Sequence, residues 1–370
     1  MNKLQNLIKE KCPDGVDYVE IKSIAEVGTG SSDRKDAVEY GEYPFYVRSK
    51  EIFKINRYEY DETAIVIPGE GGIGEIFHFV QGKYALHQRA YRIHLLDDRI
   101  DAKYLYYYMF ANFKSFIIKK AVSATVTSIR KPMIEEFEIP VPPIEVQQEI
   151  VRILDKFTEL EAELQAELNA RKKQYEYYRN QLFTFGEEIP FVTFSEISVN
   201  CDKKRKPITG SQREKGYIPY YGASGVVDYV KDYIFDGDYL LISEDGANLT
   251  ARVTPIAFSI SGKTWVNNHA HVIYFDTDID RKFIEYYLNS IDLSYYITGA
   301  AQPKLNQENL NKIPLPNPSY EVKKRFVEIL DEFSTICESE QNGLLAEIEA
   351  RHKQYEYYRD KLFTFERKVV

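Results

Sequence analysis

The stretch RKKQYEYYRNQLFTF, at Arg171–Phe185, returns later in the chain as RHKQYEYYRDKLFTF, at Arg351–Phe365. Twelve of the fifteen positions are identical. The upstream flanks also match, since IPVPPIEVQQEIVRILDKF begins at Ile139 and IPLPNPSYEVKKRFVEILDEF begins at Ile313. Self-similarity at a long, fixed period is the mark of an internal repeat. The chain is therefore predicted to contain two copies of one unit.

The segments between these flanks repeat more faintly. GEYPFYVRS from Gly41 resembles GYIPYYGAS from Gly216, and AIVIPGEGG from Ala64 resembles YLLISEDGA from Tyr239. The order of the matches is kept, and their offset stays between 174 and 180 residues. Short β-rich runs bounded by Gly, Pro, Asp and Asn alternate there with an aromatic helix. The pattern indicates a constant helical scaffold that carries two diverged globular domains.

Each closely matching segment reads as a long helix that begins after a proline-rich start signal. Apolar residues recur at alternating steps of four and three, with one extra four-residue step at Leu164–Leu168, which predicts a coiled coil with a stutter. The first helix would end near Gly186 after about 40 residues, or roughly 60 Å. The predicted coiled-coil seam consists of Ile150, Ile153, Phe157, Leu160, Leu164, Leu168, Tyr175, Tyr178, Leu182, Phe326, Ile329, Phe333, Leu344, Ile348, Tyr355, Tyr358 and Leu362.

The predicted fold class is α+β, with two globular α/β domains separated by two long antiparallel helices that form a coiled coil, and an internal pseudo-twofold repeat. A weak patch around Gly343 could kink the second helix. The predicted boundaries are an N-terminal segment at 1–18, a first domain at 19–138, a first spacer helix at 139–186, a second domain at 187–312 and a second spacer helix at 313–370.

Composition and charge exclude several classes of protein. No apolar run approaches the roughly 18 residues that a membrane span needs, and the N-terminus lacks the apolar core of a secretory signal. The three cysteines, Cys12, Cys201 and Cys337, show no disulfide or zinc spacing, so free thiols in the cytoplasm are expected. The net charge of −9 argues against a simple nucleic-acid coat. The globular domains are nearly neutral, with 17 basic and 18 acidic residues from Val19 to Glu138.

These motifs resemble the conserved regions of the DNA specificity subunits of Type I restriction–modification enzymes, the HsdS-like family. The similar parts are the opening KCPDGVDYVEIKSI from Lys11, the IPVPPIEVQQEIVRILDKF flank with its second copy, and both YEYYR and LFTF endings. The resemblance covers nearly the whole chain. Its helix motifs are specific, whereas the globular domains match in outline only.

The resemblance implies that each globular domain is a target-recognition domain for one half of a bipartite site in double-stranded DNA. The paired helices would set the spacer between the halves and dock two methyltransferase subunits, to which a motor–endonuclease subunit can be added. The segment Leu160–Arg171 (LEAELQAELNAR) resembles the tetrapeptide repeats that set spacer length in the family. S-adenosylmethionine is expected on the partner subunits, with no cofactor on this chain, no membrane partner and a cytoplasmic location.

The chain itself shows no catalytic motif. Methylation of a base amine needs an (Asp/Asn)-Pro-Pro-aromatic motif, and the Pro-Pro at Pro142–Pro143 stands in Val-Pro-Pro-Ile. The glycines of Glu26–Gly30 and Gly69–Gly74 lack the context of a phosphate-binding loop. The six histidines form no metal set, although His269 and His271 would share one strand face. A non-catalytic subunit is therefore predicted.

Candidate DNA contacts are polar and basic residues on loops, because groove readout and phosphate anchoring use such side chains. The triplets HQR and NNH fall at equivalent places in the two domains, which favours a shared role, although any one residue could be an ordinary solvated loop residue. The predicted contacts are Ser31, Ser32, Arg34, Lys35, Arg48, Lys50, His87, Gln88, Arg89, Thr125, Thr127, Arg130, Lys131, Lys203, Lys204, Arg205, Lys206, Ser224, Asn248, Arg252, Asn267, Asn268, His269, Gln302 and Lys304.

Two alternatives remain open at this point. One is a coiled-coil interaction scaffold or silent specificity cassette without a DNA role, in which alanine substitution of KKRK or GAAQPK would leave DNA affinity unchanged. The other is a self-contained methyltransferase, which the missing motifs disfavour and which cofactor binding by the isolated chain would support.

Overall fold

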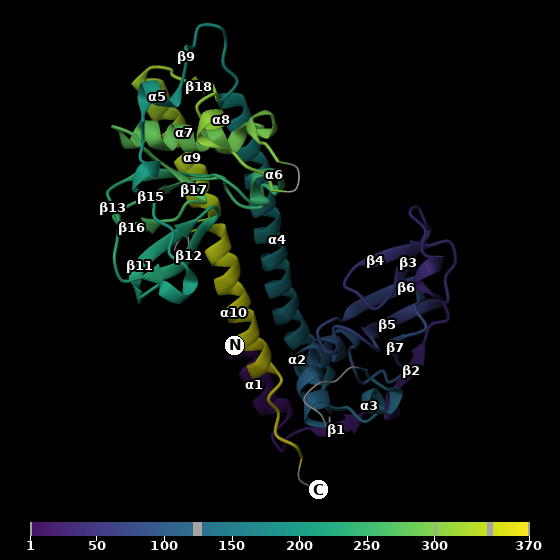
Figure 1. Ribbon diagram of the computed structural model, residues 1–370. Coiled ribbons are helices and arrows are strands. Elements are labelled where there is room, and N and C mark those ends of the chain that lie inside the picture. The colour runs from purple at the N-terminus through teal and green to yellow at the C-terminus, as the bar shows by residue number, and fades with distance from the viewer. Residues whose placement is uncertain (1, 121–127, 300–301, 339–342, 369–370) are drawn as a thin grey trace. The chain divides into compact units, whose positions relative to one another are not determined.

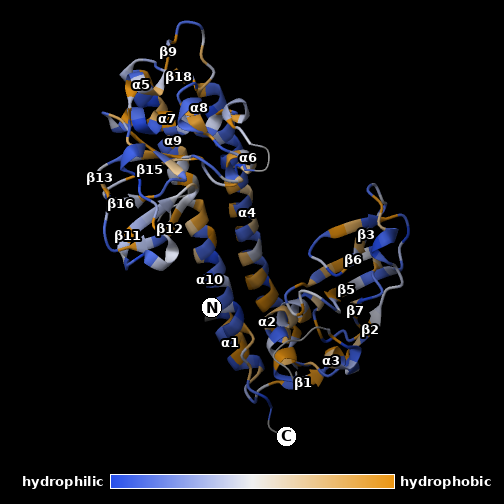
Figure 2. Ribbon diagram, in the orientation of Figure 1, coloured by the Kyte–Doolittle hydropathy of each residue, from blue (hydrophilic) through white to orange (hydrophobic). Residues whose placement is uncertain are grey.

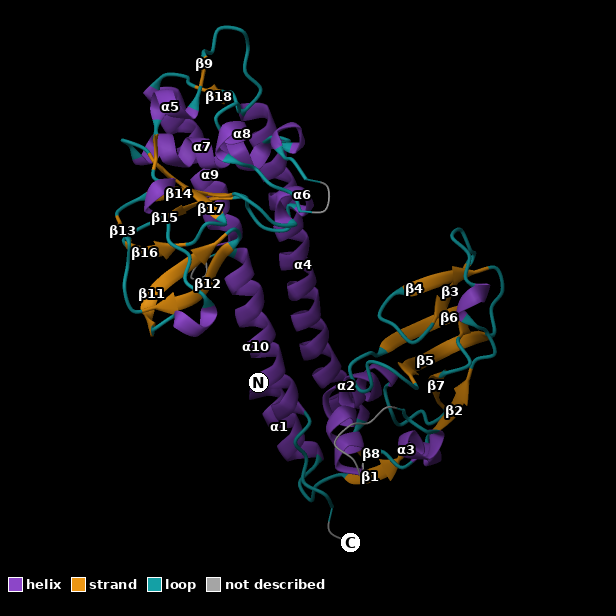
Figure 3. Ribbon diagram, in the orientation of Figure 1, coloured by secondary structure: helices purple, strands orange, loops and turns teal. Residues whose placement is uncertain are grey.

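The structure is a computed structural model that describes residues 2–120, 128–299, 302–338 and 343–368 (Figure 1). Contacts divide the chain into two units. The first unit comprises Met1–Leu164 and Ile348–Val370, and the second unit comprises Gln165–Glu347. Both units mix helix and sheet, as the sequence predicted (Figure 3). None of the helices in the described ranges is both long and apolar enough to cross a membrane.

The first unit is built on a six-stranded sheet with the order β2-β7-β5-β6-β3-β4, in which β3 and β6 run parallel. Gly30, just after β2, is needed because a Cβ there would lie 1.7 Å from the carbonyl oxygen of Leu86. This close approach brings the loop after β2 against the end of β6. The strands are β2 (Ala25–Thr29), β3 (Tyr43–Tyr46), β4 (Ile52–Ile55), β5 (Tyr60–Pro68), β6 (His78–Leu86) and β7 (Ala90–Leu95).

The aromatic helix predicted in the first domain is confirmed as α2 (Ala102–Lys120). A carboxylate oxygen of Asp101 accepts hydrogen bonds from the first backbone N–H groups, at Lys103 and Tyr104. The buried face of α2 joins the sheet in one apolar core. Around this core lie α1 (Asn2–Lys11), α3 (Lys131–Glu135), the strand pair β1 (Asp17–Glu20) and β8 (Glu138–Val141), and the short 3-10 helices η1 (Ile21–Ser23) and η2 (Arg34–Asp36).

The long helix α4 (Ile144–Leu182) starts directly after the proline pair, as predicted. In the first unit it packs antiparallel to α10 (Leu344–Leu362). The ring centroid of Phe157 lies 6.3 Å from that of Tyr355 and 5.7 Å from that of Tyr358. Apolar residues recur along α4 between hydrophilic ones (Figure 2), which is the pattern of a helix with one buried stripe.

The second unit contains two four-stranded sheets, with the orders β10-β17-β14-β15 and β12-β11-β16-β13, and one strand pair, β9-β18. In the second sheet β11 and β16 run parallel, as β3 and β6 do in the first unit. The strands are β9 (Phe191–Val192), β10 (Val199–Asn200), β11 (Lys215–Gly222), β12 (Gly225–Val230), β13 (Phe235–Asp236), β14 (Tyr239–Ser243), β15 (Ala257–Ile260), β16 (Lys263–Val266), β17 (Ala270–Tyr274) and β18 (Leu315–Pro316).

The helices of the second unit cover the first of these sheets. The aromatic helix α7 (Asp278–Ser290), whose buried face joins the core, packs on α9 (Tyr320–Glu338). The C-terminal part of α4 packs on α9 through rings, with Phe333 lying 6.3 Å from Tyr175 and 5.7 Å from Tyr178. The remaining short helices are α5 (Phe194–Ile197), α6 (Asn248–Ala251), α8 (Gln307–Leu310), η3 (Asp202–Lys204), η4 (Gly210–Gln212) and η5 (Ser294–Tyr296).

The structure describes the second spacer helix in two parts, α9, which ends at Glu338, and α10, which begins at Leu344. Residues 339–342, within the patch that was predicted to be weak, lie outside the described ranges. The seam also differs in detail from the periodic pattern. Leu154, which the pattern passed over, is fully buried, whereas the predicted Ile153 is only half-buried. Tyr178 is 41% exposed although it contacts Phe333. Leu154 belongs to the apolar core that α2 and the sheet form, and Tyr355 of α10 joins the same core.

Candidate nucleic-acid interface

The triplet His87–Arg89 directly follows β6 and gathers three loops of the first unit. The backbone N–H of His87 donates to the carbonyl of Tyr46 at 2.9 Å, and that of Gln88 donates to Ser32 at 2.9 Å. The carbonyl of Arg89 accepts from the N–H of Gly69 at 2.9 Å. The predicted clusters around Ser31, Arg48 and His87 therefore meet at one place, together with the glycine-rich loop after β5.

A carboxylate that the sequence prediction missed sits at the centre of this cluster. Glu70 accepts hydrogen bonds on the same oxygen, Oε2, from Arg48 at 2.9 Å and Arg89 at 3.1 Å. The hydrogen bond from Arg89, followed by its charge and by the contacts of Arg48, lowers the pKa of Glu70. Two guanidinium groups thus share one carboxylate, which leaves one positive charge in excess. The hollow beside them is also lined by Phe53, over whose ring Arg34 lies at 3.5 Å.

The other predicted contacts of the first unit have mixed roles. His87 is 4% exposed, and its Nδ1 accepts a hydrogen bond from the N–H of Arg89 at 3.0 Å, so its ring supports the turn of the triplet. Burial, followed by the charge of Arg48, lowers the pKa of His87. Ser32 is also buried, and its hydroxyl donates to Glu59. The exposed members are Ser31, Arg34, Lys35, Arg48, Lys50, Gln88, Arg89, Arg130 and Lys131, and Thr125 and Thr127 lie outside the described residues.

The triplet Asn267–His269 has the same backbone surroundings in the second unit. The N–H of Asn267 donates to the carbonyl of Tyr221 at 3.1 Å, as His87 does to Tyr46. The Oδ1 of Asn267 accepts from the N–H of His269 at 2.8 Å, in the role that the His87 ring has in the first unit. The carbonyl of His269 accepts from the N–H of Glu244 at 2.9 Å. Three of the hydrogen bonds that hold the triplet are therefore repeated at the candidate interface.

The carboxylate next to each triplet is preserved as well. Asp245 contacts Nδ1 of His269 with both oxygens, each at 2.9 Å. In the alignment of HQR with NNH, His269 falls opposite Arg89, and in that of AIVIPGEGG with YLLISEDGA, Asp245 falls opposite Glu70. That alignment was the sequence signal that could have singled out these acidic residues. Asn267 is 7% exposed, which matches the burial of His87.

The side chains of the basic run KKRK, residues 203–206, differ in their exposure to solvent. Lys203, Lys204 and Lys206 are exposed. Arg205 instead turns into the fold, where its Nη1 donates to Glu244 at 2.6 Å and to the carbonyl of Ala270 at 2.8 Å. Lys304 lies 3.2 Å from the other oxygen of Glu244. Two cations therefore share one carboxylate here too, but as an internal support of the loops.

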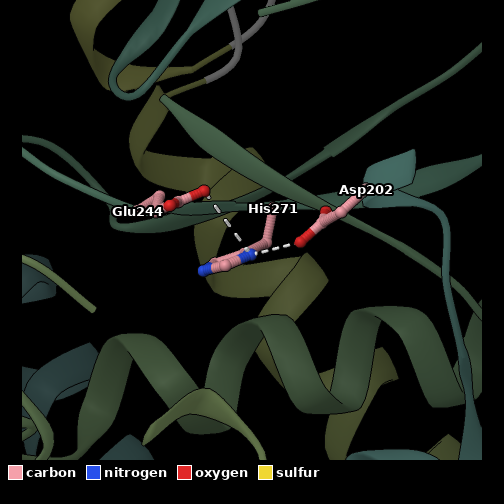
Figure 4. A group of neighbouring side chains, drawn as sticks. All are labelled: Asp202, Glu244 and His271. Atoms are coloured by element: carbon pink, nitrogen blue, oxygen red, sulfur yellow. Dashed lines mark hydrogen bonds and ion pairs between the residues drawn. The ribbon is translucent and has the colours of Figure 1, made fainter. Parts of the chain in front are cut away.

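Asp202, Glu244 and His271 lie close enough together to be considered as a metal site (Figure 4). The ring of His271 is fully engaged, since Nδ1 contacts Asp202 at 2.6 Å and Nε2 contacts the carbonyl of Leu305 at 2.8 Å. A carbonyl and an ionised carboxylate only accept hydrogen bonds, so both ring nitrogens carry hydrogen. A metal ligand needs a free lone pair on nitrogen. The group therefore fits a buried ion-pair network and does not fit a metal.

The pKa values of the two carboxyls agree with this network. Burial alone would raise the pKa of Asp202, but the hydrogen bond from His271 and further contacts outweigh burial and lower it. The pKa of Glu244 is lowered in the same way, against its burial, by Arg205, His271 and Lys304. Both carboxylates are therefore ionised at neutral pH.

Further predicted contacts of the second unit hold loops in place. Asn248 bridges to the backbone of Thr254 with both side-chain atoms, at 2.9 and 3.0 Å. Arg252 adopts a φ of +51° and donates to the carbonyls of Leu288 and Ile291. Burial lowers the pKa of its guanidinium. The exposed members are Lys203, Lys204, Lys206, Ser224, Asn268, His269, Gln302 and Lys304.

Comparison with known proteins places the chain in a family. The model of the Type I restriction modification DNA specificity domain matches twice, over residues 13–170 and 187–350. A putative type I restriction enzyme specificity subunit of Haemophilus influenzae is 34% identical over 185 residues, which cover 49% of this chain and 48% of that protein. The EcoprrI specificity subunit of Escherichia coli is 32% identical over 307 residues, which cover 76% of this chain and 73% of that one.

The EcoR124I/EcoR124II specificity subunit of Escherichia coli is 36% identical over 62% of this chain, and the match spans 63% of its own length. The match to the Haemophilus protein spans about half of its length. Among solved structures, the S subunit of a Type-I restriction-modification system from M. genitalium has a TM-score of 0.63 at 17% identity, over 94% of this chain and 96% of that one. That likeness shows a shared fold.

Proposed function

Because the chain belongs to the family of Type I restriction modification DNA specificity domains, we propose that it is the DNA sequence-specificity subunit of a Type I restriction–modification complex. Each globular domain binds one half of a bipartite site in double-stranded DNA, and the paired helices set the spacer between the halves. The observation that carries this proposal is the repeated interface, in which Glu70 with Arg89 and Asp245 with His269 occupy the same hydrogen-bonded surroundings.

The charge of this interface favours DNA recognition within a complex over tight DNA binding by this chain without partners. Many of its cations already contact carboxylates of the chain, for example Arg48 with Glu70 and Lys304 with Glu244. Phosphate contacts give the largest sequence-independent part of DNA affinity, and a paired cation contributes less to it. In this proposal the subunit is non-catalytic, and its partners supply part of the DNA affinity.

The proposed partners are two methyltransferase subunits, which a motor–endonuclease subunit can join. The stretch QYEYYR is identical in the two helices, although Tyr177 is 59% exposed and Tyr357 is 55% exposed. Packing within each unit does not require tyrosine at such positions, so two equivalent partner surfaces account for its presence. S-adenosylmethionine binds to the partners and not to this chain, and the complex works in the cytoplasm.

Long-read methylome sequencing tests this function in cells that express the chain with its methyltransferase. The expected result is adenine methylation within a bipartite motif. An assembled complex that methylates no split motif would refute the proposal. The scaffold alternative is tested by replacing Lys203, Lys204 and Lys206 with alanine, because a chain without a DNA role would keep its DNA affinity unchanged.

A further inference from the structure

We propose that Arg89, held by Glu70, is a specificity-determining residue that recognises a guanine in one half of the DNA site, and that Asp245 with His269 is the equivalent pair for the other half. This inference rests on the proposed function. It assigns a particular base to a particular side chain, whereas the family match assigns only a DNA specificity domain.

The position of Arg89 is fixed before DNA arrives. Its backbone N–H donates to the buried ring of His87, and its carbonyl accepts from Gly69. Glu70 also accepts a hydrogen bond from one guanidinium nitrogen of Arg89, Nη1, at 3.1 Å. The side chain nevertheless stays 58% exposed. A side chain that is anchored at its backbone and at one nitrogen, yet is open to solvent, loses less conformational entropy on binding.

The chemistry of the guanidinium selects the base. A guanidinium carries five N–H donors in a fixed planar fork, so one contact with Glu70 leaves a second pair of donors available. In the major groove, guanine presents two adjacent acceptors, O6 and N7, that match such a pair. Arg48 shares the same carboxylate oxygen, so the site keeps a net positive charge toward DNA. Guanine is therefore the base that this arrangement fits best.

The second unit places a different side chain in the same surroundings. His269 is 51% exposed, and its Nδ1 is engaged by Asp245, so only Nε2 is left for a single hydrogen bond. One hydrogen bond selects a base less strictly than a bidentate pair does. The two halves of the DNA site are therefore recognised by different side chains, Arg89 and His269, which are held by equivalent carboxylates. This difference agrees with helices that stayed close in sequence and globular domains that diverged.

Methylomes of variants in the full complex test the assignment. The unchanged chain is expected to give a motif with an invariant guanine at one position of one half. Arg89→Ala is expected to lower the preference for that guanine roughly 10-fold or more, and Glu70→Gln to lower it in the same direction but less, because a bidentate contact contributes discrimination of this order. Asp245→Asn is expected to change the other half only.

Arg99→Ala is the matched control, because Arg99 is a 70% exposed arginine of the same unit whose guanidinium contacts the carboxylate of Asp97 at 2.7 Å, and it is not among the predicted DNA contacts. It is expected to leave the motif unchanged. An unaltered guanine in Arg89→Ala, or relaxation in both halves, would overturn the inference while leaving the proposed function intact. If Arg89→Ala abolishes methylation, binding to duplexes substituted at each position decides the case. A uniform loss over all positions would make Arg89 a phosphate contact and would also overturn the inference.

Discussion

The hydroxyl of Tyr107 on α2 donates a hydrogen bond to Asp155 on α4 at 2.7 Å, and Lys103 contacts the other carboxylate oxygen at 2.7 Å. The second unit repeats this bridge, with Tyr286 and Lys282 of α7 on the two oxygens of Asp331 of α9, each at 2.5 Å. Each bridge ties the aromatic helix of a globular domain to a spacer helix. Burial first, and then the carboxylate contact, raises the pKa of Tyr286, so its hydroxyl keeps its hydrogen at physiological pH.

Replacing the carboxylate of Asp155 is predicted to weaken the attachment of the first globular domain to α4. Asp155→Ala removes both contacts and is expected to lower the free energy of unfolding of the first unit by about 1 kcal/mol, since Asp155 and Lys103 are more than a third exposed. Asp155→Asn keeps an acceptor for Tyr107 and is expected to cost less. Urea denaturation followed by far-UV circular dichroism measures the change, and equal stability of Asp155→Ala and the unchanged chain would contradict it.

The contacts of Asp155 and Asp331 are also predicted to affect the length of the spacer between the two half-sites in DNA. A domain held less firmly on its helix accepts half-sites at more than one distance, so the methylome of Asp331→Ala is expected to include a motif with a spacer one base pair longer or shorter. The bases within each half should stay unchanged, because Asp331 lies outside the candidate interface. A single unchanged spacer length in both Asp155→Ala and Asp331→Ala would show that the bridges do not set the spacing.

Glu149 on α4 gives a prediction with a defined pH dependence. Arg152 first, and then Lys3 at 3.0 Å, lower its pKa to about 2, against its burial. A carboxyl whose folded-state pKa is depressed contributes stability above its ordinary pKa of 4.5 and loses that contribution as the pH falls toward 2. Glu149→Gln is expected to cost on the order of 1 kcal/mol at pH 7, because both cations are largely exposed. The cost should vanish near pH 2.

Unfolding measured at several pH values checks this prediction. The one tryptophan, Trp265, lies in the second unit, where its indole N–H donates to the carbonyl of Lys206. Its fluorescence therefore follows the second unit and serves as the internal control. A change in the Trp265 transition, or a difference between Glu149→Gln and the unchanged chain that does not depend on pH, would argue against the assigned ion pairs.

The buried network around His271 should make the second unit sensitive to acid. The pKa values of Asp202 and Glu244 are both lowered in the folded state. The stability that they contribute is therefore present at neutral pH and is lost as the pH falls below the ordinary range of carboxyl groups. Asp202→Asn leaves His271, which is 1% exposed, without its anion, and is expected to cost about 3 kcal/mol at pH 7.

Trp265 fluorescence during urea unfolding reports this loss directly, since Trp265 contacts the segment that carries Asp202 and Arg205. The unchanged chain should lose stability steeply between about pH 5 and pH 3, and Asp202→Asn should show a flatter profile. Added zinc should stabilise neither protein. Stabilisation of the unchanged chain by zinc would contradict the assignment of these residues to an ion-pair network.

Sequence periodicity and the repeat were enough to predict the fold class, because both are local or near-identical signals. The start of α4 and the aromatic helix of each domain followed from proline and tyrosine patterns. Contacts between distant residues could not be predicted in this way. His271 meets Asp202 over 69 residues, and β1 pairs with β8 from Asp17 to Val141, and neither partner carries a local mark.

The candidate interface shows the same limit. Loop composition predicted which segments are polar, but it could not tell Arg89, which is exposed, from Arg205, which turns inward. The difference depends on the acceptor each finds, and that acceptor lies far away in the chain. A comparison of the two repeats goes further than either copy alone, since Glu70 and Asp245 stand at aligned positions.

Leu154 is the neighbour of Ile153, which the spacing of apolar residues assigned to the coiled-coil seam. Leu154 is fully buried in the core that joins α2, the sheet and α4, whereas Ile153 is half-buried. Removing a buried leucine side chain costs the lost burial and the cavity it leaves, so Leu154→Ala is expected to lower the stability of the first unit by about 2–4 kcal/mol. Ile153→Ala, the matched control, is expected to cost clearly less. Urea unfolding monitored by circular dichroism compares the two, and an equal or larger cost at Ile153 would restore the heptad assignment and place the structural core of this joint between the helices.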